Sequence, residues 1–204
     1  MARLLLVRHG ATEANSSRWF AGHSDIEMSV AGYGQVERLR DYLADEKIDA
    51  VYSSDLKRAK ATAEVISSGR DLDIVTCPEL REVNYGDIEG LTFQEISDLY
   101  PEVAEFIINF SLQLEFPAGE SFHGFIARTI TFLDKLEKPE PSQTMLIVSH
   151  SGPLRVLVCH LLGIDQHHWR QLRLDNASLS IVEIYPKRAI ISLLNDTSHL
   201  RGIG

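Results

Sequence analysis

Residues 4–10 read Leu-Leu-Leu-Val-Arg-His-Gly, and this short stretch predicts both a fold class and a functional site. Its four aliphatic residues form a continuous apolar run, which is typical of a strand buried on both faces of a sheet. The run ends at a cation, an imidazole and a glycine, and ligands bind where such strands pass into loops in open α/β sheets. A neutral His9 ring can attack an electrophile, and the Arg8 guanidinium suits phosphate oxygens.

The same pattern occurs a second time. Residues 145–148 form another apolar run, Met-Leu-Ile-Val, which is followed by Ser-His-Ser-Gly over 149–152. A single Arg-His-Gly tripeptide recurs by chance and would favour a strand end with a surface arginine and a structural histidine. Two apolar runs that each end in a histidine and a nearby glycine are harder to explain by chance than one. We therefore expect parallel strands that bring His9 and His150 to one edge of the sheet.

The composition is typical of one globular domain. The chain has 204 residues, of which 44% are hydrophobic, and this suits a single domain over residues 1–204 with a sizeable core. No apolar run approaches the ~18 residues of a membrane span, and we expect no signal peptide before the first strand. Cys77 and Cys159 lie in apolar stretches and are expected to be buried free thiols. These features indicate a cytoplasmic protein.

The charge balance restricts the partners. A net charge of −9 disfavours nucleic acid and anionic membranes as partners. It would also repel an anionic substrate at long range. A phosphate site therefore needs a local cluster of cations that reverses the field within the cleft. Arg8, Arg58 and the two histidines are the candidates for that cluster.

Local patterns predict alternating strands and helices. Helices are expected over about 30–45, with Ser29 as N-cap, and over about 56–68, with Asp55 as N-cap. Strands are expected at 48–53 and 73–77, a helix after Ser121, a helix from Pro153 to Gly163, and a hairpin of 179–184 with 189–194.

Two arginines conflict with the helix dipole. Arg58 lies in the first turn of its helix, where acids are favoured over cations. A bound anion would remove the conflict, because helix amides and Arg58 would hold it together, whereas a solvated Lys-Arg pair is the alternative. Arg155 repeats the conflict in the helix after His150, and there we expect a structural salt bridge.

Residues 92–118 are unusually apolar and carry two short helical patterns separated by Pro101. The segment is too apolar for a free linker. We expect it to cover the domain, within an insertion over 86–120 that forms part of the substrate pocket. A dimer surface, and hence a homodimer, is the functional alternative.

Four motifs in order resemble the histidine phosphatase superfamily, the phosphoglycerate-mutase-like enzymes. Each motif alone is weak, but their order and spacing over residues 3–180 make the resemblance strong. It implies a three-layer α/β/α sandwich around a mostly parallel sheet. The motifs are Leu-Val-Arg-His-Gly-Ala-Thr with Asn15, Ser-Ser-Asp-Leu-Lys-Arg-Ala over 53–59, Leu-Arg-Glu over 80–82 with Gly86 and Glu89-Gly90, and Val-Ser-His-Ser-Gly over 148–152.

The resemblance implies phosphoryl transfer through a phosphohistidine on His9. Arg8, Arg58 and His150 would hold the phosphoryl oxygens, and Glu82 would protonate the leaving alkoxide and then activate water. Further phosphate contacts are expected from Asn15, Gly22, His23 and the amide of Ser151, which stands where many relatives have glycine. No metal or cofactor is implied. A metal site built from the two histidines and an acid is disfavoured, because the adjacent arginines would repel the cation.

The superfamily contains both phosphatases and mutases. Cofactor-dependent mutases carry a basic insertion after the Glu-Gly motif, whereas residues 92–118 contain no lysine or arginine. Residues 116–121, followed by Phe125 and Arg128, look like those of small phosphatases such as α-ribazole phosphatase. This favours hydrolysis of a small phosphate ester, α-ribazole phosphate or another nucleoside or sugar phosphate. A phosphoglycerate mutase and a non-catalytic phosphate-binding module are the alternatives.

Overall fold

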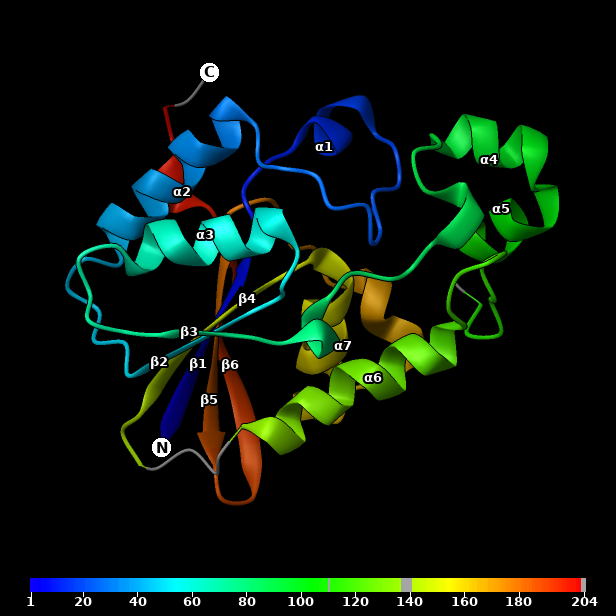
Figure 1. Cartoon of the computed structure of the whole chain (residues 1–204). Helices are drawn as coiled ribbons and strands as arrows, with labels where there is room; N and C mark the ends of the chain where they lie inside the picture. The colour runs from blue at the N-terminus through cyan, green and yellow to red at the C-terminus, as the bar shows by residue number, and fades with distance from the viewer. Residues whose placement is uncertain (110, 137–140, 203–204) are drawn as a thin grey trace.

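A computed structural model of the chain describes residues 1–109, 111–136 and 141–202. Its centre is a sheet of six strands in the order β3-β2-β4-β1-β5-β6 (Figure 1). The pairs of β2 with β3, β2 with β4 and β1 with β4 are parallel, whereas β5 is antiparallel to both β1 and β6. The strands are β1 (Ala2–Arg8), β2 (Ala50–Ser53), β3 (Ile74–Thr76), β4 (Thr144–Ser149), β5 (Leu179–Tyr185) and β6 (Arg188–Asp196).

Helices cover both faces of the sheet, which explains why β1 and β4 are continuously apolar. Leu5 and Val7 of β1 pack into one core with α2 and α3, whereas Leu4 and Leu6 pack into a second core with α6 and α7. Successive residues of a strand point to opposite faces, so a strand between two helical layers needs apolar side chains throughout. The predicted three-layer α/β/α class is confirmed. The covering helices are α2 (Val30–Tyr42), α3 (Lys57–Ser67), α6 (Phe122–Lys135) and α7 (Ser151–Leu162).

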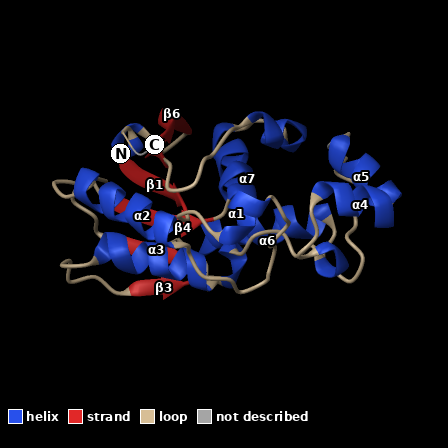
Figure 2. Cartoon of the chain, turned by 90° about the horizontal axis from the view of Figure 1, so that it is seen from above, coloured by secondary structure: helices blue, strands red, loops and turns tan. Residues whose placement is uncertain are grey.

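The apolar segment 92–118 contains the two predicted helices, α4 (Phe93–Leu99) and α5 (Pro101–Ile108). Pro101 is the first residue of α5, a position where its missing N–H costs nothing. Both helices lie at one end of the molecule, away from the sheet and beyond α6 and α7 (Figures 1 and 2). A third core joins them to the main body and includes Ile96, Ile107 and Phe125.

The remaining elements are short. They are α1 (Glu13–Ser17) and 3-10 turns at Pro78–Leu80, Gly86–Ile88, Gln166–Gln171 and Ser198–Leu200. Cys77 and Cys159 are buried and free, as predicted. No helix in the described part of the chain has the length and apolar character needed to cross a bilayer.

The N-terminus of α2 is capped by the residue that precedes it, whereas the N-terminus of α3 is capped by a residue from a distant loop. Ser29 caps α2 as predicted, its side chain accepting the N–H of Gly32. Asp55 does not cap α3, so that prediction was wrong. Its carboxylate accepts two hydrogen bonds from Arg81, at 2.7 and 2.6 Å, and Asp25 accepts the N–H of the first helical residue instead. The cap comes from 32 residues upstream, where no local pattern could show it.

Candidate active site

The carboxyl ends of β1 and β4 bring two histidines together. Arg8 lies opposite Ser149 in the parallel ladder, and the N–H of His9 donates to the Ser149 carbonyl at 2.9 Å. The imidazole centroids of His9 and His150 are 5.0 Å apart. Both residues are buried, with exposed fractions of 4% and 0%. The prediction that the two strands deliver both rings to one edge of the sheet is confirmed.

His9 is held in the tautomer that a nucleophile needs. Its Nδ1 lies 2.8 Å from the carbonyl oxygen of Gly10. A carbonyl only accepts, so Nδ1 carries the hydrogen and Nε2 keeps its lone pair. Burial lowers the pKa of His9 well below its usual value, and the positive charges of Arg58 and Arg8 lower it further. The ring is therefore neutral near pH 7.

His9 lines a cavity of about 290 Å³. Glu82 is the one acidic side chain that the described part of the chain contributes to its wall. The arginines of the wall therefore make the cavity strongly cationic although the chain carries a net charge of −9. These arginines are Arg8, Arg18, Arg58, Arg155 and Arg170, and the predicted residues Asn15, Gly22 and Ser151 also line the cavity.

Arg58 is 1% exposed and is fixed by three acceptors. Its Nη2 and Nη1 donate to the carbonyls of Gly22 and Ser24, at 2.7 and 2.8 Å. Its Nε donates to Nδ1 of His150 at 3.2 Å. A guanidinium in this position cannot rotate away without breaking all three bonds. Desolvation lowers its pKa, but arginine begins so high that it stays charged.

His150 lies behind the cavity wall. Because Arg58 donates to Nδ1, the hydrogen of the neutral ring is on Nε2, which lies 2.9 Å from the Ser54 hydroxyl. Burial, Arg58 and His9 all lower the pKa of His150. Both ring nitrogens are thus engaged with protein groups, and the ring positions Arg58 and packs against His9. Its direct contact with phosphoryl oxygens stays a prediction.

Glu89, from the Glu-Gly motif, organises the loop that holds Arg58. One of its oxygens accepts the N–H of His23 at 2.7 Å, and the other accepts the N–H and hydroxyl of Ser24 at 2.8 and 2.6 Å. Gly22 has a positive φ of 48°, and a Cβ there would lie 2.1 Å from the Glu89 carboxylate. Only glycine leaves room for the Glu89 carboxylate so close to the backbone at this position.

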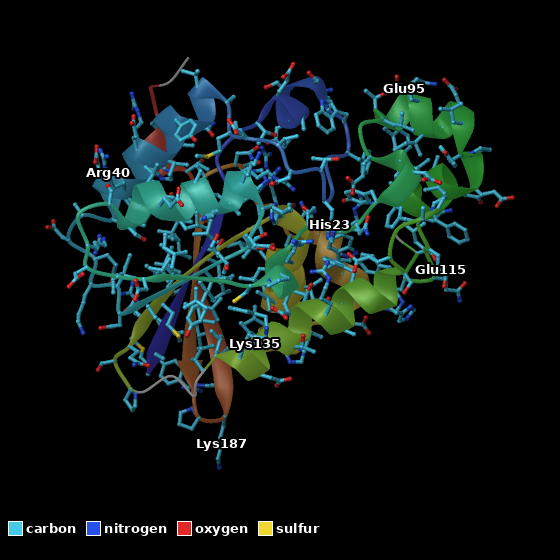
Figure 3. All side chains as sticks on the ribbon, viewed as in Figure 1. His23, Arg40, Glu95, Glu115, Lys135 and Lys187 are labelled. Atoms are coloured by element: carbon cyan, nitrogen blue, oxygen red, sulfur yellow. The ribbon has the colours of Figure 1, made fainter. Side chains whose placement is uncertain are left out.

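His23 does not line the cavity, although sequence analysis grouped it with the phosphate contacts. Its Nε2 lies 3.0 Å from the carbonyl oxygen of Glu82. Figure 3 shows His23 in the middle of the molecule, whereas Glu95 and Lys187 lie at its periphery. The ring therefore joins the loop around Gly22 to the loop that carries Glu82.

Glu82 reaches the cavity from the loop after β3. Its two oxygens accept the N–H groups of Val83 and Gly152, at 3.1 and 3.3 Å. A Cβ on Gly152 would lie 2.2 Å from the Glu82 carboxylate, so this glycine admits the carboxylate to the start of α7. Arg128 fixes the loop by donating to the carbonyls of Arg81 and Glu82, both at 3.1 Å.

Asn15 presents an amide to the cavity. Its side-chain oxygen accepts hydrogen bonds from the backbone and hydroxyl of Thr12 and from Asn176 Nδ2, which also donates to the His9 carbonyl. With the oxygen fully used, the Nδ2 group is the part of Asn15 that can donate to a ligand. Asn176 has no sequence signal, because it lies 161 residues away.

The expected salt bridge of Arg155 was wrong. Within the described ranges its guanidinium has no ion-pair partner, and its buried Nε has no hydrogen-bond acceptor. The group lies over the ring of Trp169, 5.8 Å from the centroid. Arg170 and Tyr85 also line the cavity and were not predicted to do so. Of Arg155, Arg170 and Tyr85, only Arg155 had a local sequence feature that suggested a special role, namely its expected position near a helix N-terminus.

Because His9 and His150 are buried and neutral, we expect the folded protein to lose stability in mild acid. The folded-state pKa values of His9 and His150 lie well below 6.5, so below that pH the unfolded chain binds protons that the folded chain does not. The free energy of unfolding should therefore decrease as the pH is lowered, by up to about 1.4 kcal/mol per pH unit for each ring. Urea unfolding between about pH 7.5 and 5.5 measures this slope. This pH interval lies above the pKa values of ordinary carboxylates, so their protonation contributes little to the slope.

Asparagine in place of His9 should reduce the slope, and the same change at the exposed His168 serves as the matched control. An equally steep slope in the His9→Asn variant would contradict a buried neutral ring.

Comparisons with known proteins agree with this geometry. The family model for the histidine phosphatase superfamily (branch 1) matches residues 4–197. The chain is 34% identical over 200 residues to phosphoserine phosphatase 1 of Hydrogenobacter thermophilus, covering 98% of this chain and 95% of that protein. It is also 34% identical over 199 residues to the adenosylcobalamin/α-ribazole phosphatase of Escherichia coli, covering 95% of each.

Solved structures show the same relationship. A crystal structure of a putative α-ribazole-5'-P phosphatase from Escherichia coli matches with a TM-score of 0.90 at 31% identity, covering 96% of this chain and 97% of that one. Sequence, fold and the paired histidines at the sheet edge thus agree. The chain belongs to the histidine phosphatase superfamily.

Proposed function

We propose that the protein is a phosphomonoester hydrolase that acts without a metal, through a phosphohistidine intermediate, on a small phosphorylated metabolite. One observation carries the proposal: the neutral His9 presents an unprotonated Nε2 within a cavity walled by arginines. Phosphoryl transfer needs an in-line nucleophile, cations around the equatorial oxygens and an acid for the leaving group. The cavity contains a candidate for each role.

In the first step, Nε2 of His9 attacks phosphorus and the bond from phosphorus to the ester oxygen breaks. Glu82, in its protonated form, gives its proton to the departing alkoxide. Arg8 and Arg58 neutralise the charge that spreads over the phosphoryl oxygens, and the Asn15 amide donates to the same group. As the His9 ring becomes positive, its Nδ1–H bond to the Gly10 carbonyl strengthens and stabilises the intermediate.

In the second step, water attacks the phosphohistidine. The Glu82 carboxylate takes a proton from this water, and the bond between nitrogen and phosphorus breaks. Inorganic phosphate leaves, His9 returns to its neutral state, and Glu82 is again protonated for the next cycle. His150 serves both steps by holding Arg58 and packing on the His9 ring.

We propose further that the insertion over 86–120 shapes the substrate pocket. The Ile107 carbonyl in α5 accepts a hydrogen bond from Arg170 at 2.7 Å, and Phe116 packs edge-on against Tyr85 with a centroid distance of 4.9 Å. Arg170 and Tyr85 both line the cavity. The outer surfaces of α4 and α5 expose Leu99 and Ile108, and dimerisation through them stays a second prediction.

A phosphate-release assay tests the function. With an aryl phosphate or a panel of phosphorylated metabolites, we expect inorganic phosphate to be released at the same rate with and without EDTA. Rapid quenching should trap an acid-labile phosphoenzyme. Loss of activity in EDTA would contradict metal-independent chemistry. Interconversion of phosphoglycerates that outpaces phosphate release and requires 2,3-bisphosphoglycerate would show a mutase instead.

A further inference from the structure

The cavity contains more arginines than one phosphoryl group needs. The charges of Arg58 and Arg8 act on His9 and lower its pKa, whereas Arg155 and Arg170 are not among the groups that shift it. Arg155 acts instead on Arg8, and Arg170 acts on Arg155. Arg8, Arg58, Arg155 and Arg170 all line the cavity, and only the first two act on the nucleophile.

Arg155 differs from Arg8, Arg58 and Arg170, each of which donates a hydrogen bond to a backbone carbonyl. Across the described residues no hydrogen bond or ion pair of its guanidinium is found, and its Nε is buried. A buried donor without an acceptor is costly, and such exceptions to the rule of satisfied polar groups call for an explanation.

The neighbours of Arg155 form a preorganised set of donors. Arg170 is anchored by the Ile107 carbonyl and lies over Trp169, 5.7 Å from the ring centroid, while Arg155 lies 5.8 Å from the same centroid. The Tyr85 ring packs edge-on against Phe20 and Phe116. Burial raises the pKa of Tyr85, so its hydroxyl keeps its hydrogen. Guanidinium groups and a phenol fixed in this way suit a planar carboxylate.

We propose that Arg155, with Arg170 and Tyr85 beside it, binds a carboxylate of the substrate while the phosphoryl group lies against His9. This inference rests on the proposed function and specifies its substrate class, the phosphate esters of small hydroxy acids. A volume of about 290 Å³ is at the lower end for ligand pockets and suits a compact ester that carries one phosphate and one carboxylate. The neutral nucleoside of α-ribazole phosphate would leave Arg155 unpaired.

Two substrates that differ only in the carboxylate test the proposal. The wild-type protein should hydrolyse O-phosphoserine with a kcat/KM about 10- to 100-fold higher than that for O-phosphoethanolamine, the range expected for a charged hydrogen-bonded contact. Methionine at Arg155 keeps the packing on Trp169 but removes the charge, and should bring this ratio close to one. Arg155→Lys should restore part of it. The matched control is Arg173→Met, because Arg173 is exposed and pairs with Asp175 outside the cavity; it should keep the wild-type ratio.

The outcomes separate the two proposals. Hydrolysis of an aryl phosphate with no preference for O-phosphoserine would overturn the carboxylate subsite and leave the hydrolase intact. An unchanged preference in Arg155→Met would also overturn it, as would a stronger preference for a bisphosphate that lacks a carboxylate. No hydrolysis of the aryl phosphate would overturn the proposed function, and the subsite with it.

Discussion

Replacing His9 by alanine is expected to lower kcat/KM for an aryl phosphate by about 10⁴-fold or more. The variant keeps the arginines but has no atom that can form the bond to phosphorus, so the phosphoenzyme should disappear as well. Among the described residues the His9 side chain makes one hydrogen bond, to the adjacent Gly10 carbonyl, so we expect the rest of the cavity to keep its structure. Steady-state kinetics and rapid-quench trapping measure both effects.

The control for this prediction is His168→Ala, which removes an exposed imidazole from the 3-10 turn at Gln166–Gln171. It should leave both the rate and the phosphoenzyme unchanged. Undiminished hydrolysis by His9→Ala would refute His9 as the nucleophile. Phosphate binding by the inactive variant, measured by calorimetry, would show that the loss of activity is not a loss of the site.

Replacing Arg58 by methionine is expected to lower kcat/KM by about 10³-fold, the lower range for an arginine that stabilises a transferring phosphoryl group. The same change leaves the Gly22 and Ser24 carbonyls without their donors. It should also raise the pKa of His9, since Arg58 is the largest electrostatic cause of its depression. Titration of the His9 ring by NMR reads out this shift independently of activity.

Two further variants separate charge from structure. Arg58→Lys keeps the charge but loses the three-way anchoring, so the pKa of His9 should stay low while most of the activity is lost. Arg70 also binds two backbone carbonyls, those of Glu46 and Leu43, but lies outside the cavity wall. Arg70→Met should therefore lower stability without changing kcat/KM. Equal kinetic losses in Arg58→Met and Arg70→Met would assign Arg58 a purely structural role.

Local sequence patterns predict the features that depend on neighbouring residues. The apolar runs of β1 and β4 predict buried strands, because a strand covered on both faces has no exposed side on which polar residues would alternate with apolar ones. Ser29 caps α2 through a bond to Gly32, three residues away. The glycine at 163 ends α7 with a φ of 67°, which glycine adopts without strain. In each case the partners are so close in the chain that the pattern contains the interaction.

Features that depend on distant partners were missed or misread. Asp55 looks like a cap for α3, but its carboxylate is engaged by Arg81, and Asp25 from another loop takes its place. Arg155 looks like a residue for a salt bridge, but it lines the cavity, where it forms no ion pair with any acid of the described residues. Neither outcome follows from residue type or spacing, because each depends on which loops the fold brings alongside.

The residues alone predict an α/β fold, the two strands that end in histidine, and the candidates Arg8, His9 and Arg58, because apolar runs and short motifs are local properties of the chain. Glu82 was selected only by the resemblance to the histidine phosphatase superfamily. Tertiary structure alone decides that His9 is neutral with Nε2 unprotonated, that His150 holds Arg58, and that five arginines surround one cavity. Burial, tautomer and field strength are set by groups that meet only when the sheet has formed. The physical reason is that desolvation and electrostatic interactions act across space rather than along the chain.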